Sequence, residues 1–271
     1  MVTSYYPGHM AKARRQIREL LPVLDAGVVV LDARLPRASR GQGFEEILGR
    51  RPLIYALNKV DLADPRTTAE WLASLGRAVA IEARTGLGVP DLLQACLAAG
   101  RARPGRRGRG PVRLAVLGIP NVGKSSLLNR LAGRRAMAVA DRPGVTRARQ
   151  WVRARPDLEI LDTPGLLAPR LDDADAALLL AMVAAVRDEI YGREELAGKA
   201  VALIEGRYPG RLEERYGVRL TGDTQADLEE IGRARGCLAA GGRVDTERAA
   251  ALLLADLRAG RLGRMTFESP V

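Results

Sequence analysis

The sequence predicts an α/β protein in which a mostly parallel sheet carries a phosphate-binding loop, with a smaller all-α domain behind it. Strand-like apolar runs alternate with helical patterns through residue 186, which is typical of this class. A glycine-rich loop lies between one such strand and a helix. Residues 187–271 show no strand-like alternation. We therefore expect two domains, at 1–186 and 187–271.

The run Gly118–Ser125 fits the phosphate-binding pattern G-x-x-x-x-G-K-[ST], between an apolar strand at 112–117 and a helix at 125–131. Its glycines let successive backbone N–H groups face one anion, and the helix N-terminus adds partial positive charge. Lys124 can reach the β- and γ-phosphates, and Ser125 can ligate Mg2+. The residues expected at the phosphates are Asn121, Val122, Gly123, Lys124, Ser125 and Ser126.

A chance match of a glycine-rich turn is the alternative, but three further motifs agree with a nucleotide site. Asn58-Lys59-Val60-Asp61 follows the strand at 52–57 and fits N-K-x-D, which selects guanine. The Asp61 carboxylate can accept both N1–H and N2–H of guanine, a donor pair that adenine lacks. Asn58 can bond the base and tie loops together, and the Lys59 stem can cover the face of the base.

The other two motifs supply residues near the metal and the γ-phosphate. Asp162-Thr163-Pro164-Gly165 follows the strand at 158–161 and fits D-x-x-G, which places Asp162 near Mg2+ and Gly165 near the nucleotide. The loop at 142–146 ends in Thr146, which can close on Mg2+ and the γ-phosphate. The expected Mg2+ ligands are therefore Ser125, Thr146 and Asp162.

The remaining elements follow from periodicity and from turn residues. Apolar residues at helical spacing from Met10 to Leu24 alternate with basic ones, so this amphipathic helix has either a solvated face or an RNA-facing one. We expect further strands at 27–32, 78–83 and 150–154, and helices at 44–48, 65–75, 89–98 and within 172–186. A loop through Arg37 and Arg40 joins the first strand to the helix at 44–48, and residues 133–150 form a nucleotide-sensing switch.

Two segments between these elements carry further expectations. Asp32-Ala33-Arg34 ends a buried strand, and an ion pair that fixes the loop is the favoured interpretation of Arg34. The arginine- and glycine-rich run at 101–111 is a linker by composition. It is either a solvated arm or an arm that binds RNA backbone, and we favour the second interpretation.

The guanine motif precedes the phosphate loop, whereas most GTPases have the opposite order, so the chain resembles a circularly permuted GTPase. The runs Tyr5–Met10, Asp32–Arg34 and Asp162–Leu167 resemble the ribosome biogenesis GTPase A family. The resemblance covers nearly the whole chain, is most specific up to about Arg170, and includes the closing run Asp256–Met265.

This resemblance implies a circularly permuted P-loop GTPase domain with a C-terminal helical domain. It implies a GTP-hydrolysing switch that acts in assembly of the large (50S) ribosomal subunit and binds rRNA. The Ala83 N–H would contact guanine O6, but Glu82 stands where the family has Ser. Rival interpretations are a GTP-gated RNA-binding module with negligible turnover, and a GTPase of translation or RNA modification.

The catalytic residues expected are His9, Lys124 and Thr146. Many GTPases place a water-orienting Gln after D-x-x-G, but this chain has Leu166, which neither donates nor accepts. Intrinsic hydrolysis should therefore be slow. Asn121 resembles an Asn that helps certain GTPases bind K+ beside the phosphates. The resemblance also supports His9 as a group that orients the water; the alternative is that His9 packs against or caps the first helix.

Charge and composition bound the partners. The net charge is +11 with a pI near 10.4, which indicates a polyanionic partner such as nucleic acid. Residues 187–271 hold 14 basic and 15 acidic side chains, so the 29 basic and 17 acidic side chains of 1–186 carry the charge. The apolar run at 176–186 is too short to span a bilayer, and Cys96 and Cys237 fit no metal or redox spacing. We expect a cytoplasmic monomer that does not bind membranes.

Overall fold

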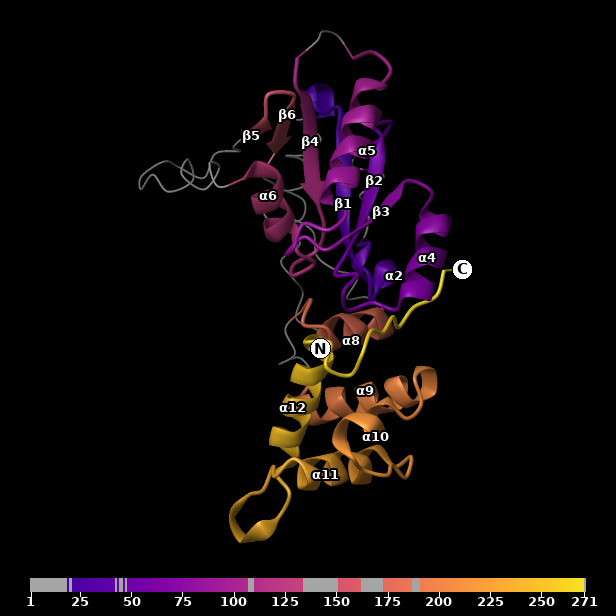
Figure 1. Ribbon diagram of the computed structural model, residues 1–271, viewed down its shortest axis with the longest axis vertical. Helices are drawn as coiled ribbons and strands as arrows, with labels where there is room; N and C mark the ends of the chain where they lie inside the picture. Colours follow the sequence, from indigo (N-terminus) through magenta and orange to yellow (C-terminus); the bar gives the residue numbers. More distant parts are fainter. Residues whose placement is uncertain are drawn as a thin grey trace, which may run out of the picture.

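The computed structural model describes residues 19, 21–41, 43, 46, 48–106, 110–133, 151–161, 173–186 and 191–270. It contains a six-stranded sheet with flanking helices and, at one end of this sheet domain, a group of helices (Figure 1). Among the described residues, no helix has the length and apolar content needed to cross a bilayer.

The sheet has the strand order β3-β2-β1-β4-β6-β5. All neighbouring strands are parallel except β5, which is antiparallel to β6. The strands are β1 (Ala26–Asp32), β2 (Leu53–Asn58), β3 (Ala78–Ile81), β4 (Val112–Leu117), β5 (Trp151–Arg155) and β6 (Leu158–Leu161). Every residue of β1 is buried, as expected for a continuous apolar run in the middle of a covered parallel sheet.

The strand order explains the unusual order of the motifs. If β4 is counted as the first strand and β1 follows β6, the sheet reads 2-3-1-4-5-6, a doubly wound order that changes direction beside the first strand. The phosphate loop follows β4, and the guanine motif follows β2. The permutation therefore changes the connections between strands but keeps each motif on its place in the sheet.

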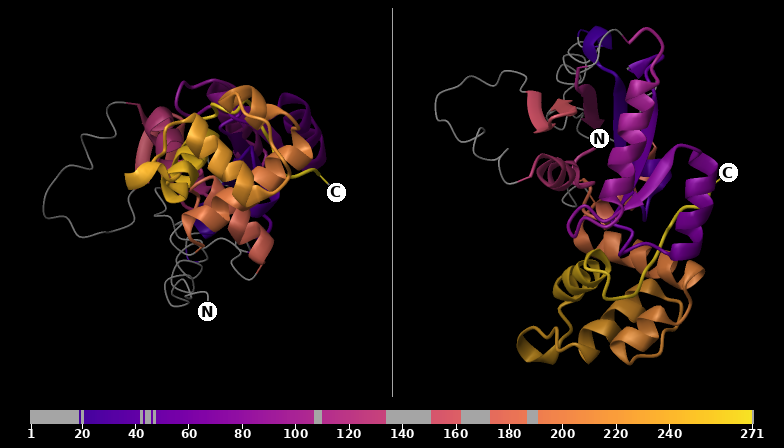
Figure 2. Two further views of the ribbon diagram at one scale, coloured as in Figure 1. Left: turned by 90° about the horizontal axis from the view of Figure 1, so that it is seen from below. Right: turned by 45° about the horizontal axis from the view of Figure 1, so that its top comes forward.

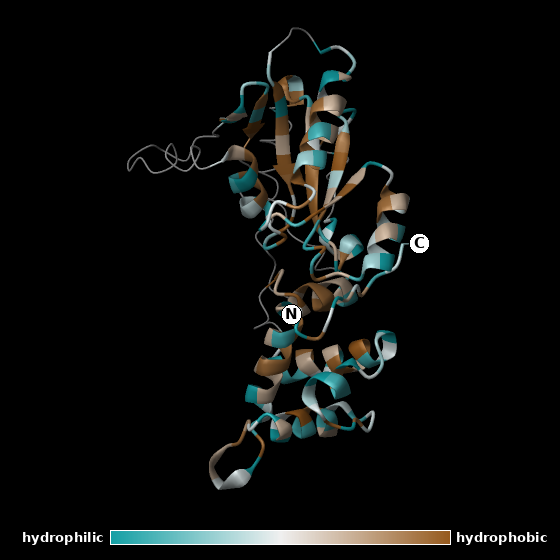
Figure 3. Cartoon of the chain, viewed as in Figure 1, coloured by the Kyte–Doolittle hydropathy of each residue, from teal (hydrophilic) through white to brown (hydrophobic). Residues whose placement is uncertain are grey.

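Alternate residues of β1 enter different parts of the core. Val28 and Val30 belong to the main cluster, whereas Val29 and Leu31 belong to a second cluster on the other face. Helix α5 (Val89–Arg101) packs against β1, β2, β3 and β4, while α4 (Pro65–Leu75) packs against β3 and α6 (Lys124–Ala132) against β4 and β5. The strands are the most hydrophobic part of this domain (Figure 3).

Helix α8 (Ala174–Met182) connects the two groups of elements. Apart from the exposed Asp175 in its first turn it is apolar, so it needs neighbours on more than one side. It packs against α2 (Pro36–Ser39) of the sheet domain and against α9 and α12 of the helical group. The right view of Figure 2 shows the orange and yellow helical group at one end of the sheet domain. The helices of that group are α9 (Arg193–Arg207), α10 (Arg211–Tyr216), α11 (Thr224–Ala234) and α12 (Thr246–Arg258). The all-helical expectation for this region is confirmed in the described residues.

The C-terminal tail returns to the sheet domain (Figure 1). The Met265 N–H donates to the Leu62 carbonyl at 2.9 Å, and the Phe267 N–H donates to the Arg34 carbonyl at 2.9 Å. The side chain of Phe267 is 3 % exposed. These bonds tie the end of the chain to the loops that follow β1 and β2.

The same tail causes the clearest departure from the expected elements. Residues Pro36–Ser39 form helix α2, although the sequence suggested a loop through Arg37 and Arg40. The Glu268 carboxylate accepts the N–H of Arg37 at 2.6 Å and that of Ala38 at 3.0 Å. The expectation was wrong because the groups that satisfy this helix start lie more than two hundred residues away.

Replacing Glu268 by Ala is expected to lower the free energy of unfolding by about 1–2 kcal/mol, the usual value of a side-chain cap. The reason is that the buried N–H of Ala38 and the partly buried N–H of Arg37 lose their acceptor. Urea unfolding measures the loss. Glu268→Gln keeps one acceptor oxygen and should lose less. Equal losses in the two variants would show that the bonds to α2 are unimportant.

The other boundaries differ by a few residues. Strand β3 ends at Ile81 rather than at residue 83, because Glu82 leaves the sheet and pairs with Leu87 in an isolated antiparallel bridge. Helix α5 extends to Arg101, so the linker is shorter than expected. Residues 44, 45 and 47 of the expected helix, the N-terminal arm and the switch from residue 134 to 150 lie outside the described residues.

Candidate nucleotide-binding site

Three loops from distant parts of the chain meet at the carboxyl ends of neighbouring parallel strands. They are residues 58–61 after β2, 82–84 after β3 and 118–125 after β4. The carboxyl edge of an open α/β sheet, beside the point where the strand order reverses, is the usual ligand site of this architecture. The sheet therefore brings the predicted guanine and phosphate motifs to one edge.

Asn58 holds these loops together. Its side-chain Nδ2 donates to the Val122 carbonyl at 2.7 Å, and its Oδ1 accepts the Ala83 N–H at 2.9 Å. Gly123 is needed beside it, since a Cβ there would come within 2.2 Å of Asn58 Nδ2. Asn58 is 3 % exposed, so both bonds are shielded from water. The tie between loops that the sequence suggested for Asn58 is present.

Lys59 makes a second tie. It has a positive φ of 65°, which non-glycine residues adopt rarely and at some cost. Its Nζ donates to Asp32 Oδ2 at 2.8 Å and to the Asn121 carbonyl at 2.8 Å. The side chain thus links the end of β1, the guanine motif and the phosphate loop.

The buried ion pair of Asp32 and Arg34 fixes the carboxylate to which Lys59 donates. Arg34 Nε and Nη2 donate to the two carboxylate oxygens of Asp32 at 3.0 and 2.8 Å, and the side chains are 3 % and 0 % exposed. Burial by itself would raise the pKa of Asp32, but the charges of Arg34 and Lys59 hold it far below its ordinary value. The predicted ion pair of Arg34 is confirmed.

The phosphate loop ends at α6, which begins with Lys124. Lys124 Nζ folds inward and donates to the Ile119 carbonyl at 2.5 Å. Burial lowers its pKa from 10.5 to about 8. Ser125 and Ser126 are exposed at the start of the same helix, with their backbone at its positive end. The loop thus combines a cation held in a poorly solvated position with a helix N-terminus.

GDP binding is expected to take up protons above about pH 7.5, because an anionic phosphate beside Lys124 raises the lowered pKa again. Calorimetry in buffers of different ionisation enthalpy should show uptake that grows from about pH 7.5 to about pH 9.

The same lowered pKa affects folding of the nucleotide-free protein. Between about pH 8 and 10.5 the Lys124 side chain binds more protons in the unfolded chain than in the folded one, so the free energy of unfolding rises with pH there. Proton uptake of zero at about pH 9 would contradict this pKa.

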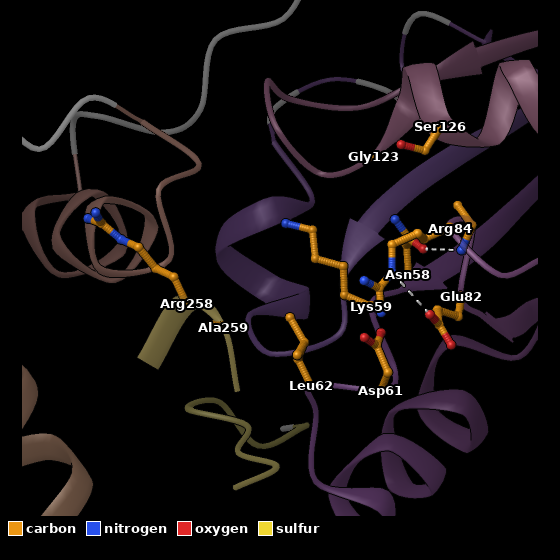
Figure 4. Close-up of a pocket in the computed structure, with 11 residues that line it drawn as sticks. Asn58, Lys59, Asp61, Leu62, Glu82, Arg84, Gly123, Ser126, Arg258 and Ala259 are labelled. Carbon is orange, nitrogen blue, oxygen red and sulfur yellow. Dashed lines mark hydrogen bonds and ion pairs between the residues drawn. The ribbon is translucent and has the colours of Figure 1, made fainter. Parts of the chain in front are cut away.

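A cavity of about 420 Å³ opens beside the two loops (Figure 4). Its volume lies in the range usual for small-molecule sites. The lining residues are Asn58, Lys59, Asp61, Leu62, Glu82, Ala83, Arg84, Gly123, Ser126, Arg258 and Ala259. Two of them, Asp61 and Glu82, are carboxylates that come from the ends of neighbouring strands.

The details at 82–84 differ from the simplest expectation. The Ala83 N–H, expected at guanine O6, donates to Asn58 in this structure. The Glu82 side chain is 13 % exposed and lies 3.5 Å from Arg84 Nε. Its buried Oε1 accepts no hydrogen bond from the residues that the structure describes. Glu82, which stands where the resembled family has Ser, therefore contributes a second carboxylate to the cavity.

The sequence did not indicate that the helical group lines part of this cavity. Arg258 and Ala259, at the end of α12, line it together with Leu62. The Arg258 guanidinium points away from Asp61 and Glu82 in Figure 4, and its Nε donates to the Met182 carbonyl at 3.0 Å. The only signal was the closing run Asp256–Met265, which contains these residues.

Asn121 adds a contact at the same junction. Its side-chain Nδ2 donates to the Ala184 carbonyl at 2.9 Å, just past the end of α8. Asn121 and Ala184 both have positive φ angles, of 56° and 57°. The phosphate loop is thus bonded directly to the segment that Arg258 holds from the other side.

Four predicted site residues, His9, Thr146, Asp162 and Gly165, lie outside the described residues. Of the three expected Mg2+ ligands the structure therefore describes Ser125 alone. No cluster of three or more acidic, His or Cys side chains suited to a metal occurs within the described ranges.

The site and the fold define a circularly permuted GTPase. The chain has a phosphate loop and an N-K-x-D loop, and its sheet has the doubly wound order when β4 is counted as the first strand. A family model described as "50S ribosome-binding GTPase" matches residues 113–203, beginning in β4 and leaving the upstream guanine motif outside. In a permuted chain, residues 113–203 are the part that keeps the usual order, with the phosphate loop ahead of the D-x-x-G motif.

Relatives cover the whole chain. Ribosome biogenesis GTPase A of Bacillus cereus is 41% identical over 281 residues, which span 100% of this chain and 95% of that protein. The protein of that name from Thermotoga maritima is 32% identical, covering 98% and 94%. The chain belongs to the ribosome biogenesis GTPase A family. The GDP-bound structure of YlqF from T. maritima is similar, with a TM-score of 0.70, 30% identity and coverage of 94% and 99%. The GNP-bound structure of that protein gives 0.69, 29%, 96% and 98%.

Proposed function

We propose that this protein is a GTP-driven switch in assembly of the large ribosomal subunit, and that it hydrolyses GTP slowly until it meets the particle. The observation that carries the proposal is the 41% identity over the full chain to a protein named ribosome biogenesis GTPase A. The meeting of the guanine and phosphate loops at one sheet edge supports GTP as the nucleotide.

The described residues support a division of roles at the nucleotide. Asp61 would accept N1–H and N2–H of guanine from the wall of the cavity. Lys124 and the amides of residues 121–126 would neutralise the phosphates, since they stand at the N-terminus of α6. Asn58 and Lys59 would hold the two loops at a fixed separation. Because these two loops are already joined, GTP needs to impose little ordering on them.

Mg2+ fits this site by the chemistry of its donors. Ser125, Thr146 and Asp162 offer hydroxyl and carboxylate oxygens, which are the ligands Mg2+ prefers. The ion would neutralise charge on the β- and γ-phosphates. Lys124 and the loop amides would hold the same phosphates from the side of the sheet.

Leu166 leaves the attacking water without an orienting side chain at the usual position. Asn121 is one candidate to compensate, through K+ beside the phosphates. Its bond to the Ala184 carbonyl uses the amide nitrogen, and the oxygen is the atom that a K+ ion needs. His9 is the other candidate, as a group that orients the water from the N-terminal arm.

The decisive experiment measures GTP turnover by the protein alone and with purified large ribosomal subunits, in K+ and then in Na+ buffer. We expect stimulation of at least about tenfold that requires both the particle and K+. The His9→Ala variant should lose the stimulated rate and keep GTP affinity. Turnover indifferent to the particle would favour a GTP-gated RNA-binding module, and indifference to K+ would leave Asn121 as a structural residue.

The partner on the particle is proposed to be rRNA. The charge of +12 on residues 1–186 favours a polyanion over a neutral protein surface. We propose that the protein acts as a monomer in the cytoplasm. Sedimentation of the purified protein with and without GTP tests the monomeric state, and a stable dimer would contradict it.

A further inference from the structure

A second cavity, which we call the basal groove, lies at the amino ends of β2 and β3, opposite the nucleotide site. Its volume is about 920 Å³. It is lined by residues 49–54 and 76–79 and by Ala95, Ala98, Ala99, Ala102 and Pro104. The strands run from this edge toward the helical group, so the groove faces away from that group (Figure 1).

The lining of the groove is positively charged. It contains Arg50, Arg51 and Arg77 and has no Asp or Glu. Arg50 and Arg77 are exposed, and neither forms an ion pair or a side-chain hydrogen bond with the residues that the structure describes. By contrast, the nearby Arg101 is paired with Asp157 at 2.8 Å. Two guanidinium groups therefore face solvent without compensation.

Arginines next to the lining residues in the sequence add to this charge. Arg103 and Arg106 share one carboxylate, that of Asp25, at 3.4 Å each. Arg51 is held by two bonds to the Leu21 carbonyl, at 3.0 and 2.6 Å. Burial, and next the charge of Arg103, lower the pKa of Arg51, which is the effect of crowded positive groups. The single carboxylate of Asp25 thus offsets only a fraction of the positive charge of the surrounding arginines.

The floor of the groove indicates the kind of polyanion. Ala95, Ala98 and Ala99 stand on one face of α5, and Ala102, its C-cap, continues the same spacing of i, i+3, i+4 and i+7. Their small side chains leave the groove open. No aromatic side chain is among the lining residues, so the groove offers no platform on which unpaired bases stack. Arginines without aromatics suit the phosphates of a double helix, which is recognised by its backbone and shape.

We propose that the basal groove binds the phosphodiester backbone of double-helical RNA, with Arg50 and Arg77 as its phosphate contacts. This inference rests on the proposed function, which supplies the RNA partner. It assigns a contact to the end of the sheet that the nucleotide does not use. Guanidinium groups bond phosphate in a bidentate manner, so two exposed arginines that line one open groove are suited to phosphate contacts.

The test measures binding of a fluorescent RNA duplex of about 20 base pairs as a function of salt. Arg50→Glu/Arg77→Glu is expected to lower affinity more than about tenfold and to reduce the log–log salt slope by about two, one for each lost contact. The single variants Arg77→Glu and Arg66→Glu form a matched pair, because Arg66 lies in the first turn of α4 and Arg77 lies just beyond its C-cap, Gly76. Arg66 is 91% exposed and outside the groove, so its variant should stay within about twofold of wild type.

GDP affinity should be unchanged in all these variants, which shows that the fold and the nucleotide site are intact. RNA affinity of Arg50→Glu/Arg77→Glu equal to wild type, or an equal loss in Arg66→Glu, would overturn the groove assignment. Loss of large-subunit binding with full RNA-duplex binding would assign the groove to an acidic protein instead. Wild-type protein that binds no large subunits would defeat the proposed function itself, a result separate from the variants.

Discussion

Asp61→Asn is expected to lower GTP affinity by about a hundredfold. The Asn oxygen can still accept one guanine N–H, but the amide NH2 opposes the other, and a hydrogen bond to a charged group is worth about 1.5–3 kcal/mol. The same change should create affinity for xanthosine triphosphate. The carboxylate of Asp61 accepts two guanine N–H groups, whereas an Asn amide can donate to the extra carbonyl of xanthine. Asp61 lines the cavity beside the phosphate loop, so the exchange should alter base choice alone.

Direct titration with labelled GTP and with labelled xanthosine triphosphate measures this exchange. Glu82→Gln is the matched control, because Glu82 is the other carboxylate of the same cavity. That variant should keep the preference for GTP. If Asp61→Asn binds GTP as wild type does, or if Glu82→Gln produces the exchange, the assignment of the guanine acceptor to Asp61 is wrong.

Much of the nucleotide site was predictable because its chemistry restricts the sequence locally. A strand, a glycine loop and a helix start must be contiguous to form a phosphate cradle, so Gly118–Ser125 carries its own context. The N-K-x-D motif likewise follows β2 directly. The bond from Asn58 to Val122 shows that two separately predicted motifs are neighbours.

The rest depends on contacts across long sequence separations. Helix α2 begins where Glu268 supplies acceptors, and no local pattern around Pro36 indicates that partner. The cavity wall at Arg258 depends on how the helical group docks on α8. The basal groove combines residues near 50, 77 and 98 that share no motif. Periodicity reports burial within one element, and these features belong to pairs of elements.

Asp32→Ala should lower the free energy of unfolding by about 3–5 kcal/mol, the usual cost of breaking a buried ion pair. The Arg34 guanidinium would remain buried without its carboxylate, and its Nη1 already has no hydrogen-bond partner in the described residues. Lys59 would also lose one of its two bonds. Urea unfolding measures the loss, and Asp32→Asn, which keeps one acceptor but removes the charge, should lose less.

The double variant Asp32→Leu/Arg34→Met separates the ion pair from the site. Replacing both partners by apolar side chains restores much of the stability, because no buried charge is left alone. GDP affinity should nevertheless stay below wild type, since Lys59 still lacks the Asp32 anchor that holds it against the phosphate loop.

The pKa of Asp32 is lowered, so the stability that its carboxylate contributes is present above about pH 4 and is lost only as the pH falls further. The loss in free energy of unfolding caused by Asp32→Ala should therefore be the same at about pH 6 and pH 8. A double variant with normal GDP affinity would mean that Lys59 is positioned by Asn121 alone, and that Asp32 serves the core rather than the nucleotide.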